Sequence, residues 1–335
     1  MSPNRGASRA VRALLVTAIA LLALATAARR AFLHGEYLPF PEDALAPRES
    51  RVVVDGIART YAWAGPASRG GAPLVLALHG AFADGRTMRR QLGPTFERVA
   101  LEDGAVVVYP DAWRGQWNDC RAAGSLASRA RGVDDVAFLR ALVRRFATSH
   151  RIDTTRVYVV GFSNGAHMGF RLALEAPALI GGLAAIGAQL PASGNLACRP
   201  SPPRAIPVML VNGTADPISP VNGGEVSVRG FAKRGRVRSA LETAHWFAEA
   251  AGLGAEHASR RLPDLDGDGS WVEERTWSLL GRPSVTLLLV HGAGHTLPAR
   301  DATFPSLLGR TNHDVDAATL IWRFFQDQAH VARAP

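Results

Sequence analysis

The sequence of 335 residues has little of several residue types, and each scarcity excludes a class of protein. Only 20% of the residues are charged and 47% are hydrophobic, which excludes a disordered chain and a coiled coil. Lysine occurs once, at Lys233, so the formal net charge of +9 comes from scattered arginines. Five of these arginines lie in the first thirty residues, and no nucleic-acid-binding motif accompanies them. We therefore expect no nucleic-acid partner.

The chain also lacks long apolar runs, with one exception near the N-terminus. Residues 13–28 carry no charge, follow Arg5, Arg9 and Arg12, and end in small residues, as in a secretory signal peptide. We predict a signal peptide or an uncleaved N-terminal membrane anchor over residues 1–30, and an extracellular or periplasmic location. The proline-containing segment 31–48 is expected to be a tether. No repeat or linker divides the rest, so residues 49–330 are predicted to form a single catalytic domain.

Cysteine is scarce as well, because only Cys120 and Cys198 are present. Both lie in the part of the chain that we expect to be exported. Two cysteines in an oxidising compartment can form one disulfide bond, and we predict that these two are bonded.

Short apolar runs alternate with helical patterns along the domain, which predicts an α/β fold with a mostly parallel central sheet flanked by helices. No long insertion separates 183–186 from 207–211, so no large lid is expected. Ligands of such sheets lie beyond the carboxyl ends of the strands. The predicted strands are 51–54 and 60–64 (joined by an Asp55-Gly56 turn), 73–78, 105–109, 157–160, 183–186, 207–211 and 285–290, and the predicted helices are 133–148, 166–176 and 317–328.

The strongest motif is Gly161-Phe162-Ser163-Asn164-Gly165, which lies between a predicted strand and a predicted helix. This G-x-S-x-G pattern is typical of a tight turn that holds a nucleophilic serine above a sheet. Small residues two positions away on each side are required because the turn is so sharp. We predict that Ser163 is a nucleophile with a strained backbone and a positive φ.

A serine nucleophile needs a base and an acid, which follow it along the chain in this type of sheet. Asp216 is the first carboxylate after the predicted strand 207–211, whereas its rivals Asp264, Asp266 and Asp268 lie in a turn. The base is expected after the strand 285–290, where His291 and His295 both occur. We favour His295, because a loop position suits a base; His291 and the more distant His313 remain alternatives.

Acyl transfer also requires donors for an oxyanion. We expect the backbone amides of Asn164, next to the nucleophile, and Ala81, in the loop after 73–78, to supply them. His79 in this loop is expected to be a structural hydrogen-bonding residue. No metal site is predicted, because His291 and His295 lack the glutamate of a helical H-E-x-x-H motif.

Further motifs give the chain a specific resemblance. Together they resemble the polyhydroxybutyrate depolymerase and feruloyl esterase family, close to carbohydrate esterase family 1 within the α/β-hydrolases. The resemblance implies an α/β-hydrolase fold and a triad of Ser163, Asp216 and His295, although Leu297 stands where many members have tryptophan. The motifs are Leu78-His79-Gly80, Tyr109-Pro110-Asp111, Trp117-Asn118-Asp119, Gly161 to Gly165, Gly213 to Pro217, Asn222-Gly223-Gly224, Gly294-His295-Thr296 and Ile321 to Phe325.

Three weaker features remain. Trp113 and Trp117 follow the strand 105–109 and are candidates for stacking on a substrate. The acidic segment 264–269 resembles the start of a calcium loop, but Arg275 stands where the loop needs a glutamate, so we predict a tight hairpin turn. The segment 229–238 is rich in basic residues and is expected to be a solvated loop, with an acidic polysaccharide as an alternative ligand.

From these features we expect an exported serine esterase that works through a covalent acyl-enzyme and needs neither cofactor nor metal. Its expected partner is an ester, including polymeric ones such as polyhydroxyalkanoates or esters of plant polysaccharides. Contact with a membrane is expected only through an uncleaved N-terminal segment. The alternatives are a serine peptidase on the same fold and a non-catalytic envelope protein that binds glycans or lipids.

Overall fold

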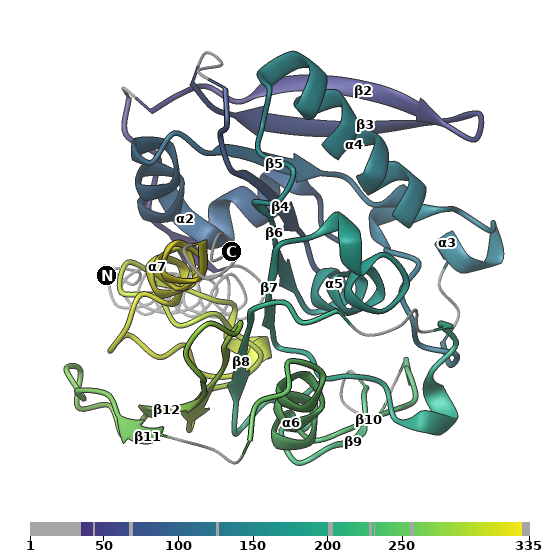
Figure 1. Ribbon diagram of the computed structural model, residues 1–335. Coiled ribbons are helices and arrows are strands. Elements are labelled where there is room, and N and C mark those ends of the chain that lie inside the picture. The colour runs from purple at the N-terminus through teal and green to yellow at the C-terminus, as the bar shows by residue number, and fades with distance from the viewer. Residues whose placement is uncertain are drawn as a thin grey trace, which may run out of the picture.

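A ten-stranded sheet runs through the computed structural model, with helices on both of its faces (Figure 1). The structure describes residues 35–42, 44–66, 70–124, 127–199, 204–227, 230, 232–254 and 258–329. The predicted leader, residues 1–30, lies outside the described residues. Within those that are described, no helix has the length and apolar character needed to cross a membrane.

The sheet combines a parallel centre with antiparallel edges. Its strand order is β11, β12, β13, β8, β7, β6, β4, β5, β3 and β2, and the strands from β13 to β5 run parallel. The strands are β2 (Arg48–Val54), β3 (Ile57–Ala64), β4 (Leu74–Leu78), β5 (Val106–Pro110), β6 (Val157–Phe162), β7 (Gly182–Ile186), β8 (Val208–Gly213), β11 (Ala258–Arg261), β12 (Trp271–Trp277) and β13 (Val285–His291).

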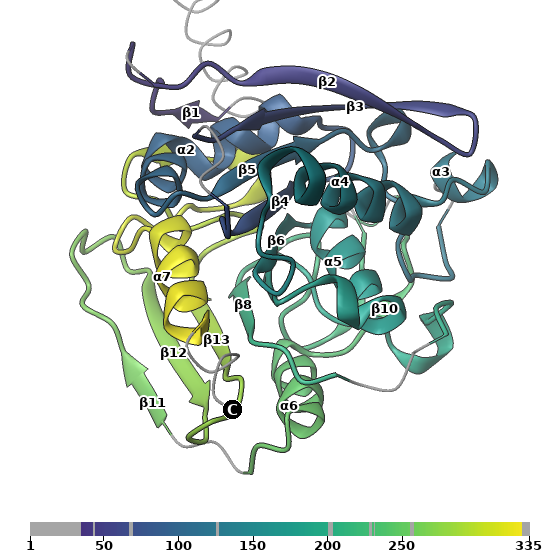
Figure 2. The same ribbon diagram turned by 45° about the horizontal axis from the view of Figure 1, so that its top comes forward.

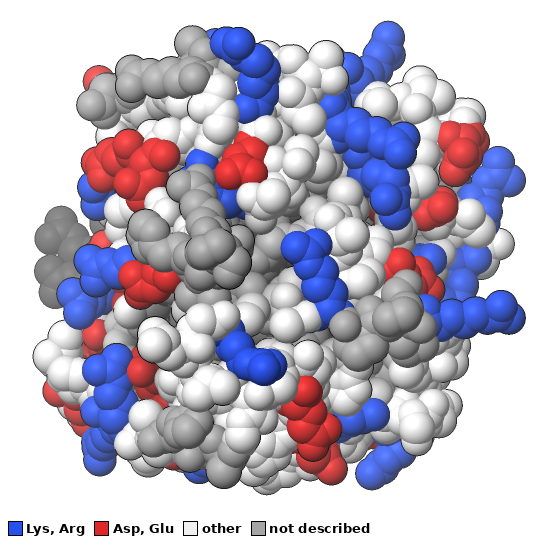
Figure 3. Space-filling view, viewed as in Figure 1, with Lys and Arg blue, Asp and Glu red and all other residues white. Residues whose placement is uncertain are grey.

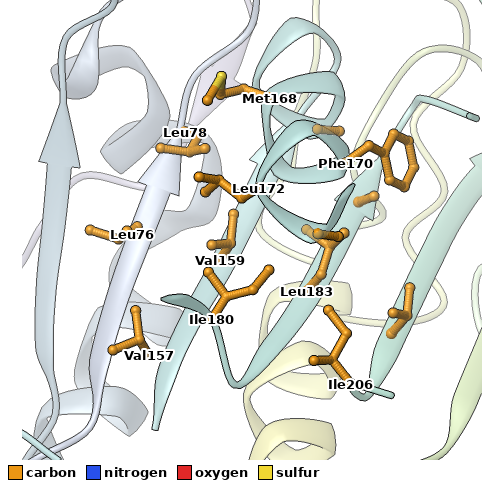
Figure 4. Close-up of a cluster of buried hydrophobic side chains, with 14 of the residues drawn as sticks. Leu76, Leu78, Val157, Val159, Met168, Phe170, Leu172, Ile180, Leu183 and Ile206 are labelled. Carbon is orange, nitrogen blue, oxygen red and sulfur yellow. The ribbon is translucent and has the colours of Figure 1, made fainter. Parts of the chain in front are cut away.

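Two hydrophobic cores form because alternate residues of each buried strand face opposite sides of the sheet. Val157 and Val159 of β6 belong to one core, and Tyr158 and Val160 belong to the other. Figure 4 shows Val159 of β6 on the face that α5 covers with side chains such as Leu172. One face carries α2 (Gly85–Glu102) and α7 (Ala317–Ala329); the other carries α4 (Asp135–His150), α5 (Asn164–Glu175) and α6 (Ala240–Ala250) (Figure 2).

Short elements complete the described part of the chain. Among them is a small hairpin after β8, which forms one wall of the cavity that contains Ser163. These elements are β1 (Glu36–Tyr37), η1 (Trp113–Gly115), α3 (Ala127–Ala130), η2 (Pro177–Leu179), η3 (Ser193–Asn195), β9 (Gly224–Glu225), β10 (Arg236–Val237), β14 (Ala302–Thr303) and η4 (Ser306–Leu308).

The predicted mostly parallel sheet, flanked by helices, is confirmed. The Asp55-Gly56 turn is also confirmed, with φ of +50° and +74° between β2 and β3. The sequence pattern missed α2, which contains the helix-breaking pair Gly93-Pro94, with Gly93 at φ +78°.

The tether predicted over 31–48 is wrong for its central part. Glu36–Tyr37 forms β1, which pairs with β14, and the Tyr37 ring lies 5.7 Å from the Phe304 ring. Aromatic rings are stabilised by edge-to-face packing, so this segment packs on the domain.

Candidate active site

Ser163 occupies the sharp turn between β6 and α5. Its backbone has φ +53° and ψ −112°, which confirms the predicted positive φ. The turn leaves no room for side chains at its neighbours: a Cβ on Gly165 would lie 2.1 Å from the Leu78 carbonyl oxygen, and one on Gly161 would lie 2.5 Å from the Gly165 carbonyl oxygen. The glycines of the motif are therefore required by the close approach of three backbone segments.

Asp216 and His295 form a buried hydrogen-bonded pair at the same edge of the sheet. Asp216 follows β8, and its Oδ1 accepts the backbone amides of Ile218 (2.7 Å) and Ser219 (2.8 Å). Its Oδ2 lies 2.6 Å from Nδ1 of His295, and the two side chains are 0% and 3% exposed. The pairing at Nδ1 leaves Nε2 of the imidazole free to exchange a proton.

The His295 ring is fixed from two further sides. A Cβ on Gly187 would lie 2.9 Å from its Cε1 atom, so a glycine is needed directly after β7. The Phe162 ring lies 5.1 Å from the imidazole, centroid to centroid. These contacts hold the imidazole in place without adding a charged neighbour.

Ser163, Asn164 and His295 line one cavity with a volume of about 280 Å³. Within the described part of the chain, the Ser163 hydroxyl makes no hydrogen bond, so it is not bonded to His295 in this state. Such bonds are often long in unliganded sites and shorten when the substrate binds. The serine and the imidazole are thus brought to one cavity, with the hydroxyl open to it.

The two predicted oxyanion donors also line this cavity. Asn164 is the first residue of α5, so its amide has no acceptor within the helix and lies at the positive end of the helix dipole. Ala81 lies in the loop after β4. The next amide, that of Phe82, is bonded to the Gly115 carbonyl oxygen at 2.8 Å, so it is not available to a ligand.

A buried polar network lies behind Asn164. Its side chain accepts the amide of Trp117 (2.8 Å) and donates to Oδ2 of Asp119 (2.6 Å). Asp119 in turn pairs with Arg121, at 2.6 Å. Burial alone would raise the pKa of Asp119, but the charge and hydrogen bonds of Arg121 lower it to about 2. Asp119 is therefore ionised at neutral pH, and its carboxylate orients Asn164.

His79 has the structural role expected of it. Its Nδ1 lies 2.7 Å from the Gly80 carbonyl oxygen, and its Nε2 accepts the amide of Ala112 at 3.0 Å. Burial lowers the pKa of this imidazole, which keeps it neutral. A neutral imidazole can hold both bonds and so connects the loop after β4 to the loop after β5.

The prediction that Trp117 contacts a substrate is wrong. Its side chain is 0% exposed, and its indole donates to the His79 carbonyl oxygen at 2.9 Å. A buried indole needs an acceptor for its N–H group and apolar neighbours for its ring, and the His79 carbonyl oxygen in the loop after β4 supplies the acceptor. Trp113 is half-buried in η1, with the Arg114 guanidinium 4.6 Å from its ring, and it does not line the cavity.

The alternative bases and acids lie elsewhere. His291 stacks on Trp271 with ring centroids 3.7 Å apart, and His313 Nδ1 is bonded to the Ala299 carbonyl oxygen at 2.7 Å. Neither of them lines the cavity. The rival carboxylates at 264, 266 and 268 lie in the connection between the antiparallel strands β11 and β12, which confirms the predicted hairpin, although residues 262–270 form a longer connection than a tight turn.

The predicted disulfide bond is confirmed, since Cys120 and Cys198 are bonded, with their Cα atoms 5.0 Å apart. The Ala197 amide donates to the Cys120 carbonyl oxygen next to it, at 2.8 Å. The bond ties the loop of the buried network to the segment that follows η3.

Sequence reasoning missed several residues of the cavity wall. Phe82 is 77% exposed at its mouth, in a positive-φ conformation of +62°. In the sequence, the one indication that Phe82 belongs to the cavity wall was its position next to Ala81. Two arginines, Arg121 and Arg234, line the cavity as well. Further apolar side chains come from Ile218, Val226, Leu307 and Leu308.

Comparison with known proteins identifies relatives whose names include esterases. Residues 111–243 match the family model described as Phospholipase/Carboxylesterase. The chain is 30% identical over 301 residues to "Putative esterase NocK" of Nocardia uniformis subsp. tsuyamanensis, covering 86% of this chain and 84% of that protein.

Two further relatives are larger proteins. The identity is 27% with "Feruloyl esterase B" of Piromyces equi, over 46% of this chain and 28% of that protein. It is 34% with "Poly(3-hydroxybutyrate) depolymerase" of Ralstonia pickettii, over 33% of this chain and 24% of that protein. The chain therefore matches about a quarter of the length of each.

Proposed function

The chain belongs to the α/β-hydrolase esterases, and on that premise we propose that it cleaves carboxylic esters with a triad of Ser163, Asp216 and His295. The observation that carries the proposal is the cavity that receives both a strained serine, at φ +53°, and an imidazole bonded to a buried carboxylate at 2.6 Å. A serine and a histidine that only pack in a core require neither a strained serine backbone nor an imidazole bonded to a buried carboxylate.

The reaction runs in two steps through a covalent acyl-enzyme. Nε2 of His295 takes the proton of the Ser163 hydroxyl as Oγ attacks the ester carbonyl carbon. The imidazolium then gives that proton to the leaving alcohol as the C–O bond breaks. A water molecule repeats the sequence on the acyl-enzyme, so that the acid leaves and Ser163 recovers its proton.

Two other groups stabilise charge during these steps. Asp216 faces the imidazolium across its 2.6 Å bond and holds the ring with Nε2 directed away from it. The amides of Ala81 and Asn164 donate to the oxyanion of each tetrahedral intermediate, and each such donor contributes about 3–4 kcal/mol where it has been measured. Asp119 supports the second donor by holding the Asn164 side chain.

We further propose that residues 49–330 are one catalytic domain and that the enzyme is exported. We also propose that its substrates include polymeric esters, such as polyhydroxyalkanoates or esters of plant polysaccharides. The disulfide bond supports export, because such bonds persist in oxidising compartments. The names of two relatives, a feruloyl esterase and a poly(3-hydroxybutyrate) depolymerase, suggest the substrate panel.

The test is hydrolysis of that panel by the purified full-length chain and by Ser163→Ala. The panel holds p-nitrophenyl acetate and butyrate, methyl ferulate, a 3-hydroxybutyrate oligomer and a peptide anilide. We expect ester turnover that Ser163→Ala reduces by about a thousandfold or more. Ser193→Ala, an exposed serine of η3, is the matched control and is expected to keep full activity.

Three outcomes would contradict the proposal. Equal rates for wild type and Ser163→Ala would show that this serine is not the nucleophile. Cleavage of the anilide above the ester rates would favour a peptidase. Inertness of the wild type toward every ester and toward a fluorophosphonate would favour a binding protein.

A further inference from the structure

The charged side chains that line the candidate cavity, among the residues that the structure describes, are two arginines. Arg121 precedes α3, and Arg234 lies between β9 and β10. On the outer face drawn in Figure 3, by contrast, basic and acidic side chains are interspersed. The described lining of the cavity thus carries two arginines and no carboxylate.

Arg121 is only partly neutralised. Its Nε and Nη2 atoms donate to Asp119, with the shortest distance at 2.6 Å, which leaves Nη1 without a bond to any described residue. Asp119 also faces Arg129 at 3.7 Å. One carboxylate thus serves two guanidinium groups before Arg234 is considered.

Arg234 has no carboxylate of its own. Its guanidinium forms neither an ion pair nor a hydrogen bond with any residue of the described ranges, although it is half-buried. Glu225, the acidic residue of the β9–β10 hairpin, accepts the amide of Gly235 at 2.8 Å. Burial, followed by the charge of Arg121, lowers the pKa of Arg234, and the charge of Asp119 only partly opposes this.

A half-buried guanidinium loses part of its hydration, and an anion that binds it compensates for that loss. Guanidinium groups bind carboxylates through two parallel hydrogen bonds, and such charge-assisted bonds are stronger than neutral ones. Both arginines line a cavity of about 280 Å³ that Ser163 also lines, so a carboxylate bound to them and an ester group at Ser163 could belong to one small molecule.

We propose that Arg234, assisted by Nη1 of Arg121, forms a carboxylate subsite, so that the preferred substrate is an ester that also carries a carboxylate. This inference rests on the proposed esterase function and adds the substrate class. The apolar side of the same cavity, which includes Phe82 and Leu308, contacts the uncharged part of the substrate.

The test compares matched neutral and anionic esters. Ethyl hexanoate and monoethyl adipate differ by a carboxylate on the acyl side, and phenyl acetate and 4-acetoxybenzoate differ by one on the alcohol side. For at least one pair, we expect kcat/KM of the wild-type enzyme to be about tenfold higher for the anionic ester, and this ratio to fall as salt is added.

Variants assign the preference to the subsite. Arg234→Gln is expected to lower kcat/KM about tenfold for the preferred anionic ester and to change the neutral partner by less than about twofold. Arg236→Gln removes the same charge from an exposed position nearby and is expected to change neither. Arg121 is unsuitable as the primary variant, because its loss would leave Asp119 buried and unpaired.

The inference is overturned if the wild type is active but shows no anionic preference in either pair, or if Arg234→Gln slows both members of a pair equally. If the wild type hydrolyses no ester at all, the proposed function fails, and the carboxylate subsite is then tested by a binding measurement that does not depend on catalysis. In that case, calorimetry with adipate should show saturable binding that Arg234→Gln abolishes and Arg236→Gln retains. Absence of adipate binding would overturn the subsite too.

Discussion

Two buried carboxylates support the same cavity, and the difference between their partners separates scaffold from chemistry. Asp119 pairs with Arg121, whose guanidinium has hydrogen-bond donors and no acceptor, so this pair can only hold a geometry. Asp216 pairs with Nδ1 of His295, whose second ring nitrogen, Nε2, can accept the proton of a serine hydroxyl. Burial is similar for both acids; the chemistry of the partner decides which pair is able to transfer a proton.

The largest effect is expected where the proton-transfer pair is broken. Asp216→Asn should lower kcat/KM for esters by about 10⁴-fold, because the imidazole loses the acceptor that fixes its tautomer. The melting temperature should change little, since the asparagine Oδ1 still accepts the amides of Ile218 and Ser219. Asp327→Asn, on the exposed side of α7, is the control. A loss below tenfold would remove Asp216 from the triad.

Breaking the scaffold pair should affect stability first. Asp119→Ala leaves Arg121 buried without its carboxylate and is expected to lower the free energy of unfolding by about 3–5 kcal/mol, measured by urea denaturation. The double variant Asp119→Leu with Arg121→Met should recover most of that loss, because no charge remains buried. If the single variant were as stable as wild type, Asp119 would not be the scaffold described above.

The disulfide bond reinforces the scaffold side of the comparison. The variant with both Cys120→Ala and Cys198→Ala should lose about 2–4 kcal/mol of unfolding free energy, because the bond closes a long loop in the unfolded chain. Ester turnover at low temperature should persist, since neither cysteine lines the cavity. Reduction of the wild type with dithiothreitol should reproduce the shift, and an unchanged denaturation midpoint would contradict it.

The pH dependence of stability sharpens the comparison further. The pKa of Asp119 is lowered in the folded chain from 3.8 to about 2, so its contribution is fully present above about pH 4. That contribution should be lost as the pH falls from about 4 to about 2. The stability gap between wild type and Asp119→Ala should accordingly narrow by about 2 kcal/mol over this range, as followed by urea denaturation. A stability difference between the two proteins that does not change with pH would contradict the lowered pKa of Asp119.

The smallest effect is expected for Phe82, at the mouth of the cavity. Phe82→Ala should raise KM for apolar esters a few-fold, about 1 kcal/mol, because the ring is exposed and contributes only surface for a substrate to cover. Leu280→Ala, a fully exposed leucine outside the cavity, is the matched control. Stability should be unchanged in both. An unaltered KM would show that substrates do not reach this side of the mouth.

Much of the fold was accessible from the sequence, because strands buried on both faces are short continuous apolar runs. The turn at Ser163 was accessible for the same local reason, as its glycines and flanking strand lie within ten residues. The helix α2 was not, because Gly93 and Pro94 break its pattern and tertiary packing restores it. The position of β1 also depended on a distant partner, β14.

The sequence by itself determined the order of nucleophile, acid and base along the chain and the pairing of its two cysteines, because local turn chemistry and residue count suffice for these. Only the tertiary structure decided that Trp117 is buried and that Phe82 and Arg234 face the cavity. The reason is physical: exposure and charge balance depend on which distant segments meet, and a residue's neighbours in sequence do not specify its neighbours in space.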